Sequence, residues 1–316
     1  MITALAAAFA LASFAPQVPP AVAPGPTPAA PAQDPSPTDL GEVVVEGRRL
    51  RDEAEAFVDA VAAPATGRGL ARWGGRVCIG VVNLRPDLSH AVIDHISRVA
   101  LENDLRIGDP GCTPNVVIIF TADAPAMASA LVAADRRAFH LGVGGLDRGG
   151  RALEAFQTSE APVRWWHVSM PVIGGTHVRA IRMPGDTAPI YVPGEGLVNK
   201  GRPISDELNK VIVIVDTDRL GGANLAQLSD YLSLVALAQV DPEGPTQGLD
   251  TILNVFVDPA GVKGLTAWDR TYLRALYRAP TERIDDNDQA ASIVRTVSRQ
   301  RRERDRGSPG SGAAAD

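Results

Sequence analysis

Residues 227–242 read Gln-Leu-Ser-Asp-Tyr-Leu-Ser-Leu-Val-Ala-Leu-Ala-Gln-Val-Asp-Pro, and this stretch decides the fold of the C-terminal half of the chain. Its density of apolar residues predicts a buried helix over residues 223–240. Four polar residues interrupt the pattern: Ser229, Asp230, Ser233 and Gln239. Because Ser229 and Ser233 are four positions apart, a helix places both on one face. The stretch therefore predicts an apolar helix with a polar stripe.

The segments around this helix predict an α+β domain over residues 50–282. The most strand-like stretch is Lys210–Val215, whose β-branched residues suit the centre of a sheet. Apolar runs and helical spacing predict further elements. These are strands over 77–82, 115–120 and 177–183, and helices over 51–62, 90–104 (capped by Ser89), 125–135 and 267–278. The expected architecture is a mixed, twisted sheet packed on helices.

The two ends of the chain differ in composition from the domain. Residues 1–15 are almost wholly apolar and are typical of a secretory signal peptide. Residues 16–49 are predicted to be a disordered spacer because their first part is rich in Pro and Ala. Within it, residues 41–49 favour an edge strand or linker. Residues 283–316 are predicted to be a charged, flexible tail, although one more helix could form there. A Gly-rich stretch over 141–150 is expected to be a mobile loop.

The chain holds two cysteines, Cys78 and Cys112. An even pair in an exported chain favours a disulfide, and two buried free thiols are the alternative. Together with the N-terminal segment, the pair predicts a periplasmic or secreted location.

The net charge of the chain restricts the classes of partner that we expect it to bind. The net charge of −6 argues against a nucleic-acid protein, which usually carries a strong basic field. Contact with a membrane is expected only through an uncleaved N-terminus or the basic run at 299–304, for which a solvated tail is the favoured interpretation. The expected partner is an envelope protein or peptide of unknown identity. No cofactor is expected.

The order of segments after residue 227 resembles the metzincin and matrixin-like zinc peptidases, or zincins. These carry a His-Glu-x-x-His helix that continues to a Gly and a third His, then a turn beneath the metal, then a closing helix. The resemblance covers about 55 of the 316 residues. The closing-helix pattern fits best, at Leu265, Thr266, Asp269, Leu273, Leu276 and Tyr277.

The resemblance places substitutions at the catalytic positions. Ser229 and Ser233 stand where the first two His ligands would be, Asp230 replaces the general-base Glu, and Gln239 replaces the third His. Leu253 replaces the Met of the turn. Catalytic zinc takes three His or carboxylate ligands, so neutral hydroxyls and an amide do not form that site. No metal or cofactor is therefore expected at these positions.

Three functions remain open. The first is a pseudo-enzyme whose polar stripe faces a groove and binds something in the former cleft. The second is a plain structural domain, in which Ser229 and Ser233 bond back to carbonyls four residues earlier and Asp230 is solvated. The third is a working hydrolase with its metal elsewhere, which would need ligands from the five histidines His90, His95, His140, His167 and His177. His90 and Asp94 have ligand spacing, but a surface ion pair is the favoured interpretation.

A broader resemblance is to a group of uncharacterised exported proteins from alphaproteobacteria. It rests on Arg72-Trp73 before the first cysteine strand, on Cys112-x-Pro-Asn115 before the second, and on Leu228-x-Asp-Tyr-Leu in the late helix. It implies an exported domain with a degenerate zincin-like site.

Overall fold

The structure, a computed structural model, describes residues 40–64, 69–139, 148–173, 179–182, 190–192, 196–198, 204–279 and 286–307. The predicted signal peptide, the spacer up to residue 39 and most of the Gly-rich stretch lie outside these residues, as do residues 177, 178 and 183 of the strand expected at 177–183, of which residues 181–182 form a strand. Among the described residues no helix is both long enough and apolar enough to cross a membrane.

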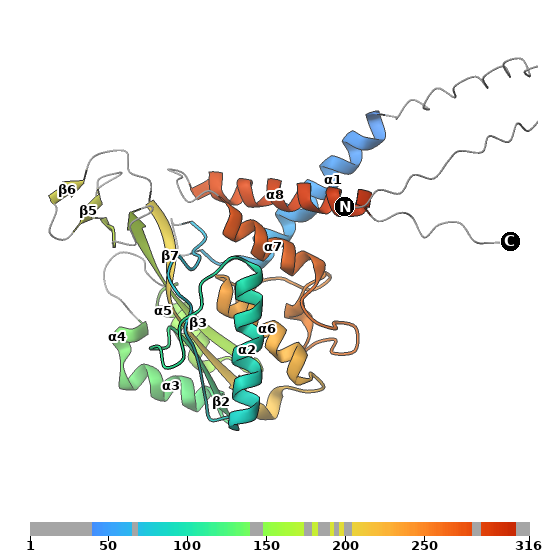
Figure 1. Cartoon of the computed structure of the whole chain (residues 1–316). Coiled ribbons are helices and arrows are strands. Elements are labelled where there is room, and N and C mark those ends of the chain that lie inside the picture. Colours follow the sequence, from blue (N-terminus) through green and yellow to red (C-terminus); the bar gives the residue numbers. More distant parts are fainter. Residues whose placement is uncertain are drawn as a thin grey trace, which may run out of the picture. The chain divides into compact units, whose positions relative to one another are not determined.

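A mixed four-stranded sheet forms the centre of the domain, in the order β1-β2-β7-β3 (Figure 1). β1 (Ile79–Val82), β2 (Val116–Thr121) and β7 (Ile204–Asp216) are parallel, and β3 (Val163–Ile173) runs antiparallel to β7 at the edge. The α+β prediction is thereby confirmed, as is the interior position of the β-branched run. A small antiparallel sheet contains β4 (Ile181–Arg182), β5 (Ile190–Val192) and β6 (Gly196–Val198).

Helices cover both faces of the main sheet, because its strands are apolar on both faces. The larger core lies on the side of α1 (Leu40–Val61), α2 (Pro86–Glu102), α6 (Leu225–Leu237), α7 (Ala267–Arg278) and α8 (Asp286–Gly307). The smaller core lies on the side of α3 (Ala124–Ala134), α4 (Arg136–Phe139) and α5 (Gly150–Thr158). Neighbours on β3 alternate between them: Trp165 packs in the larger core and Trp166 in the smaller one.

Both ends of the domain differ from the sequence-based expectation. Residues 41–49 belong to α1, so the prediction of an edge strand or linker there is wrong, and the spacer cannot extend to residue 49. α8 is not a flexible tail over its described length, because Ile293 and Val297 are buried against the core. An apolar stripe at helical spacing anchors this otherwise charged helix.

The start of α2 also differs. The helix begins at Pro86 and not after Ser89, because proline suits the first turn, where its missing N–H is not needed. Ser89 donates to the carbonyl of Leu84 and caps no helix.

Cys78 and Cys112 form a disulfide, as predicted. The bridge joins the residue before β1 to the loop before β2, with the two Cα atoms 6.1 Å apart. The Asn115 side chain reinforces the same corner: it accepts from the Cys78 N–H and donates to the carbonyl of Arg76. This corner fixes the register in which β1 and β2 enter the sheet.

Candidate functional site

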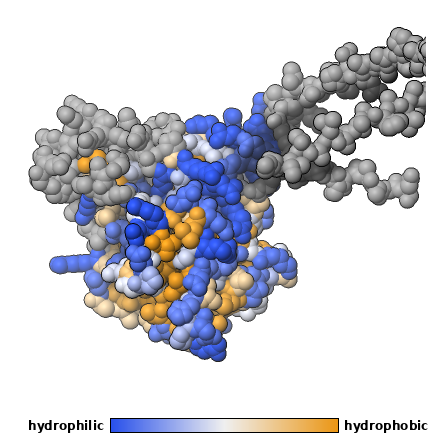
Figure 2. Space-filling view, viewed as in Figure 1, coloured by the Kyte–Doolittle hydropathy of each residue, from blue (hydrophilic) through white to orange (hydrophobic). Residues whose placement is uncertain are grey.

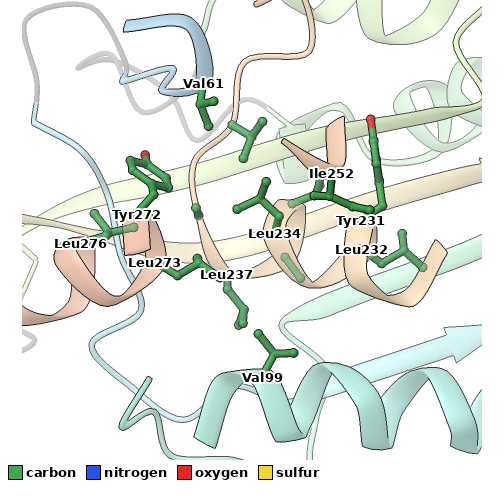
Figure 3. Close-up of a cluster of buried hydrophobic side chains, with 14 of the residues drawn as sticks. Val61, Val99, Tyr231, Leu232, Leu234, Leu237, Ile252, Tyr272, Leu273 and Leu276 are labelled. Carbon is green, nitrogen blue, oxygen red and sulfur yellow. The ribbon is translucent and has the colours of Figure 1, made fainter. Parts of the chain in front are cut away.

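α6, the helix that resembles a zinc-peptidase helix, is buried on all sides. Every residue from Gln227 to Leu237 is buried. Figure 3 shows Leu232, Leu234 and Leu237 of α6 packed within a cluster that includes Val99 of α2 and Leu273 of α7. The helix starts with a capping box between Asn224 and Gln227. α6 is therefore a central core helix and not the wall of a groove.

The two serines of the polar stripe are used inside the helix. The Ser229 hydroxyl donates to the carbonyl of Leu225, and the Ser233 hydroxyl donates to the carbonyl of Ser229, each at 2.7 Å. The expectation that these residues face a groove is wrong, because both side chains are enclosed by the core. The bonds are those expected for a plain core helix, since a buried hydroxyl needs a partner and the carbonyl four residues back is nearest.

Asp230 links three parts of the domain. Its Oδ1 lies 2.6 Å from Nε2 of His95 on α2, and its Oδ2 accepts from the backbone N–H of Leu265 at 2.9 Å. Arg98 lies beside His95, 3.1 Å from its Nδ1. The prediction that a plain core helix would leave Asp230 solvated is therefore wrong. The carboxylate joins α2, α6 and the segment that leads into α7.

Gly264 makes room for this carboxylate. A Cβ at position 264 would lie 2.4 Å from Oδ2 of Asp230, which is closer than real Cβ contacts come. Gly264→Ala must therefore displace either the carboxylate or the backbone that donates to it. We expect the free energy of unfolding to fall by about 2–3 kcal/mol, measured by urea denaturation. Gly75→Ala is the matched control, because no atom lies within 4 Å of its Cβ position. Equal stability of the two variants would contradict the role given to Asp230.

Gln239 and Leu253 also occupy structural positions. The Gln239 side-chain carbonyl accepts from the backbone N–H of Ala71, and its main-chain carbonyl accepts from the N–H of Ala63. The amide thus ties the end of α6 to the chain that precedes β1. Leu253 lies half-buried in a 3-10 turn over Ile252–Asn254, where the resemblance places its turn. The tight turn of the resemblance is therefore present, and the residues aligned with the zinc ligands make hydrogen bonds within the domain.

The closing-helix motif clamps this turn to α7. Thr266 and Asp269 form a capping box at the start of α7. Asp269 also accepts from the Thr251 hydroxyl at 2.7 Å and from the Ile252 N–H at 2.8 Å. Burial raises the pKa of the Asp269 carboxyl, and the hydrogen bonds from Thr251, Thr266 and Ile252 oppose that shift. Thr266 and Asp269 of the closing-helix motif therefore have a structural role, which is to start α7 and to fix the turn against it.

Polar backbone groups gather along the outer edge of β3. The Asp216 N–H of β7 donates to the carbonyl of Pro162, while the Val211 N–H points the other way, to Asn115 beside β2. In an antiparallel pair, successive residues point their backbone N–H and C=O groups alternately toward the partner strand and away from it. The pairing register places the groups of Val163, Trp165 and His167 on the side away from β7. The sheet ends at β3, so these groups have no ladder partner in the described part of the chain.

A pocket of about 70 Å³ lies against this edge. One wall is the C-terminal part of α5 with residues 159–161, and the other is Val240, Pro242 and Glu243. Arg148 also lines the pocket and pairs with Asp241 at 2.9 Å. The volume would hold one short side chain or a few water molecules. The pocket therefore places a mostly apolar space beside unpaired main-chain donors and acceptors.

Arg164 is a buried cation in the same wall. Its Nη1 donates to the carbonyls of Phe156 and Gln157, whereas its Nε and Nη2 have no hydrogen-bond partner in the described part of the chain. Burial lowers the pKa of the Arg164 guanidinium, and the nearby carboxylate of Asp216 opposes the shift. Its role in the wall is to hold the end of α5 against β3.

His167 is a neutral imidazole beside the pocket. Its Nε2 lies 2.8 Å from the Val235 carbonyl, which can only accept, so Nε2 carries the proton and Nδ1 presents a lone pair. Burial, opposed by the bond to Val235, lowers the pKa of His167 from 6.5 to about 4. The structure places His167 on β3.

The lowered pKa of His167 predicts a pH dependence of stability. Between pH 6.5 and 4 the imidazole is protonated in the unfolded chain but neutral in the folded chain. The contribution of His167 to the free energy of unfolding is therefore fully present above pH 6.5 and is lost as the pH falls toward 4. The loss should approach about 3 kcal/mol. His167→Gln keeps a donor for the carbonyl but does not titrate. The fall in unfolding free energy from pH 7.5 to pH 4 should therefore be about 3 kcal/mol smaller in the variant, and an equal fall would contradict the assignment.

The histidines are not gathered into a metal site in the described part of the chain. His90 and Asp94 are both exposed with no hydrogen bond between them, His95 pairs with Asp230, and His140 and His177 lie outside the described residues. Within that part, no group of three or more His, Cys, Asp or Glu side chains is close enough to hold a metal ion. No protein-family model, curated protein or solved structure matches the chain.

Proposed function

We propose that the chain is an exported cell-envelope protein with a zincin-like scaffold, without peptidase chemistry, that binds an extended peptide segment at the outer edge of β3, beside the pocket. The observation that supports peptide binding is the row of N–H and C=O groups at Val163, Trp165 and His167, which point away from β7 beside a pocket. An extended peptide adds to such an edge through main-chain hydrogen bonds, and a pocket selects one side chain.

Burial strengthens this choice of ligand. All three edge residues are buried, and buried main-chain groups need partners. A peptide backbone carries complementary donors and acceptors in the same spacing, so it can pair with these groups. The walls of Ala152, Ala155 and Val240 suit a small apolar side chain.

The scaffold part of the proposal rests on the order of elements. A buried strand leads to α6, then to the turn at Ile252–Asn254 and to a closing helix with the Thr266–Asp269 capping box. The order of helix, turn and closing helix is that of the resemblance described above. The lack of peptidase chemistry rests on the residues aligned with the ligands and base, since Ser229, Asp230, Ser233 and Gln239 each serve a hydrogen bond within the fold.

Export is supported by two features. The N-terminal segment over residues 1–15 has the composition of a signal peptide. The Cys78–Cys112 disulfide is of the kind that persists in oxidising compartments.

Peptide binding is tested by titrating ¹⁵N-labelled protein with a mixture of capped random hexapeptides. We expect shifts of the amide signals of Val163, Trp165 and His167, and at least a tenfold loss of affinity in Ala155→Phe, which fills the pocket. Ala91→Phe, on the exposed face of α2, is the control and should bind normally. Unchanged amide signals, or full binding by Ala155→Phe, would overturn the proposal.

The absence of peptidase chemistry is tested separately with casein and with quenched fluorogenic peptides, in the presence of added zinc. We expect no cleavage above the buffer rate. Cleavage by the wild-type chain that Asp230→Asn abolishes, while the variant stays folded by circular dichroism, would refute this part. That outcome leaves the binding proposal to be judged on the titration alone.

A further inference from the structure

Arginines from two distant parts of the sequence meet where α1 and α8 touch. The Ser298 hydroxyl, buried on α8, donates to the carbonyl of Val294 at 2.7 Å and lies 3.5 Å from the carbonyl of Leu50 on α1, which places these two residues where the helices meet. The arginines of residues 48–54 and 295–302 lie within about two helical turns of this contact. They are Arg48, Arg49, Arg51, Arg295, Arg299, Arg301 and Arg302.

The arginines on α8 form a continuous stripe. Arg295, Arg299 and Arg302 are spaced four and three residues apart, so they share one face of the helix. Arg295 and Arg299 are exposed and Arg302 is half-buried, while Ile293 and Val297 hold the opposite face in the core. Arg48 and Arg51 continue the basic surface on α1, and both are exposed. The surface around the α1–α8 pair is largely hydrophilic in Figure 2.

The charge of this cluster opposes that of the rest of the chain. Its two segments hold seven of the 31 basic residues but only two of the 37 acidic ones, Asp52 and Glu53. Arg49 is already paired with Glu53, and the Arg301 guanidinium lies 4.9 Å from the centre of the Trp268 ring. With the adjoining exposed residues Glu55 and Glu303 included, the cluster carries a formal charge of +3, and the remainder of the chain carries −9. An anionic surface repels the acidic part of such a protein and attracts its cationic end, so the protein approaches the surface with that end first.

We infer that the α1–α8 arginine cluster is a docking surface for anionic lipid headgroups. A lipid surface is the chosen partner because an array of exposed guanidinium groups complements phosphate headgroups, and because the apolar segment at residues 1–15 precedes α1 in the sequence and adds a second membrane signal while it remains attached. An apolar segment and a polybasic patch are the two signals that together give stable membrane attachment, while either alone is marginal. Guanidinium groups suit phosphate because their paired N–H donors match its oxygens.

The test is sedimentation of the full chain with phosphatidylglycerol–phosphatidylcholine vesicles. Neutralising the α8 stripe with Arg295→Gln, Arg299→Gln and Arg302→Gln should lower the vesicle partition coefficient by about 100-fold at low salt. The control carries Arg76→Gln, Arg85→Gln and Arg98→Gln, which removes the same charge from exposed sites elsewhere, and should bind as the wild type does. Binding should also weaken as salt is raised.

Three outcomes would overturn the inference, of which the first two concern the vesicles and the third concerns free phosphate. One is equal binding of the two triple variants, which would assign attachment to the apolar segment or to net charge. Another is binding that persists on pure phosphatidylcholine vesicles. Inorganic phosphate added in excess should displace little protein, because the surface recognises an array of headgroups; complete release by millimolar phosphate would contradict the lipid assignment.

Discussion

Replacing Asp269 by alanine is expected to lower the free energy of unfolding by about 4 kcal/mol. The side chain is fully buried and accepts from the Thr251 hydroxyl and from the backbone N–H groups of Ile252 and Thr266. Alanine leaves the Thr251 hydroxyl and the Ile252 N–H buried and the Thr266 N–H half-buried, all without this partner, and each unsatisfied buried group costs about 1–3 kcal/mol. The loss removes the cap of α7 and also releases the turn beneath α6.

Urea denaturation followed by tryptophan fluorescence measures this effect, since Trp268 lies in the first turn of α7. Asp250→Ala is the matched control: it removes an exposed carboxylate from the same segment and should change stability by less than about 0.5 kcal/mol. If Asp269→Ala were as stable as Asp250→Ala, the closing-helix motif would need an explanation other than its role in the fold.

Removing the disulfide with Cys78→Ser and Cys112→Ser is expected to lower the free energy of unfolding by about 4 kcal/mol. The bridge spans 34 positions in sequence, and cross-linking a loop of this length restricts the unfolded chain by about that amount. It also joins the approaches to β1 and β2, the pair at the outer end of the sheet.

Chemical denaturation of the double variant measures the cost directly. Wild-type protein treated with a reducing agent should lose the same stability, and the reducing agent should not affect the variant. A double variant as stable as the oxidised wild type would show that the Asn115 hydrogen bonds at this corner suffice without the bridge.

Local patterns in the sequence predict much of the larger core. The spacing of apolar residues in 51–62 and 267–278 corresponds to helices whose apolar faces are buried, and the β-branched run at Lys210–Val215 lies inside the sheet. These segments bury enough apolar surface that local propensity and tertiary packing agree. The disulfide followed from cysteine count alone.

β3 was not predicted as a strand because its signal is mixed. Residues 163–173 combine apolar residues with Arg164, His167 and Ser169, which interrupt both the alternation and the continuity that mark strands. Their burial depends on partners far away in sequence, such as the Val235 carbonyl for His167. The pocket was missed for the same reason, since its two walls come from α5 and from the segment after α6.

The polar residues of α6 show the limit of motif comparison. Alignment of Ser229, Asp230 and Ser233 with catalytic positions predicts their spacing on a helix correctly. Whether that face meets solvent or core depends on what packs against it, and here α2 and α7 cover it. A groove-facing stripe and a buried one have the same sequence pattern, so only the fold separates them.

The most direct test of the central claim, that the catalytic-position residues serve the fold, is Asp230→Ala examined for both stability and peptide hydrolysis. We predict a loss of about 2–3 kcal/mol in unfolding free energy, because the Leu265 N–H and His95 lose their partner, with no hydrolysis by either protein. A variant that keeps full stability but loses a hydrolytic activity present in the wild type would contradict the account.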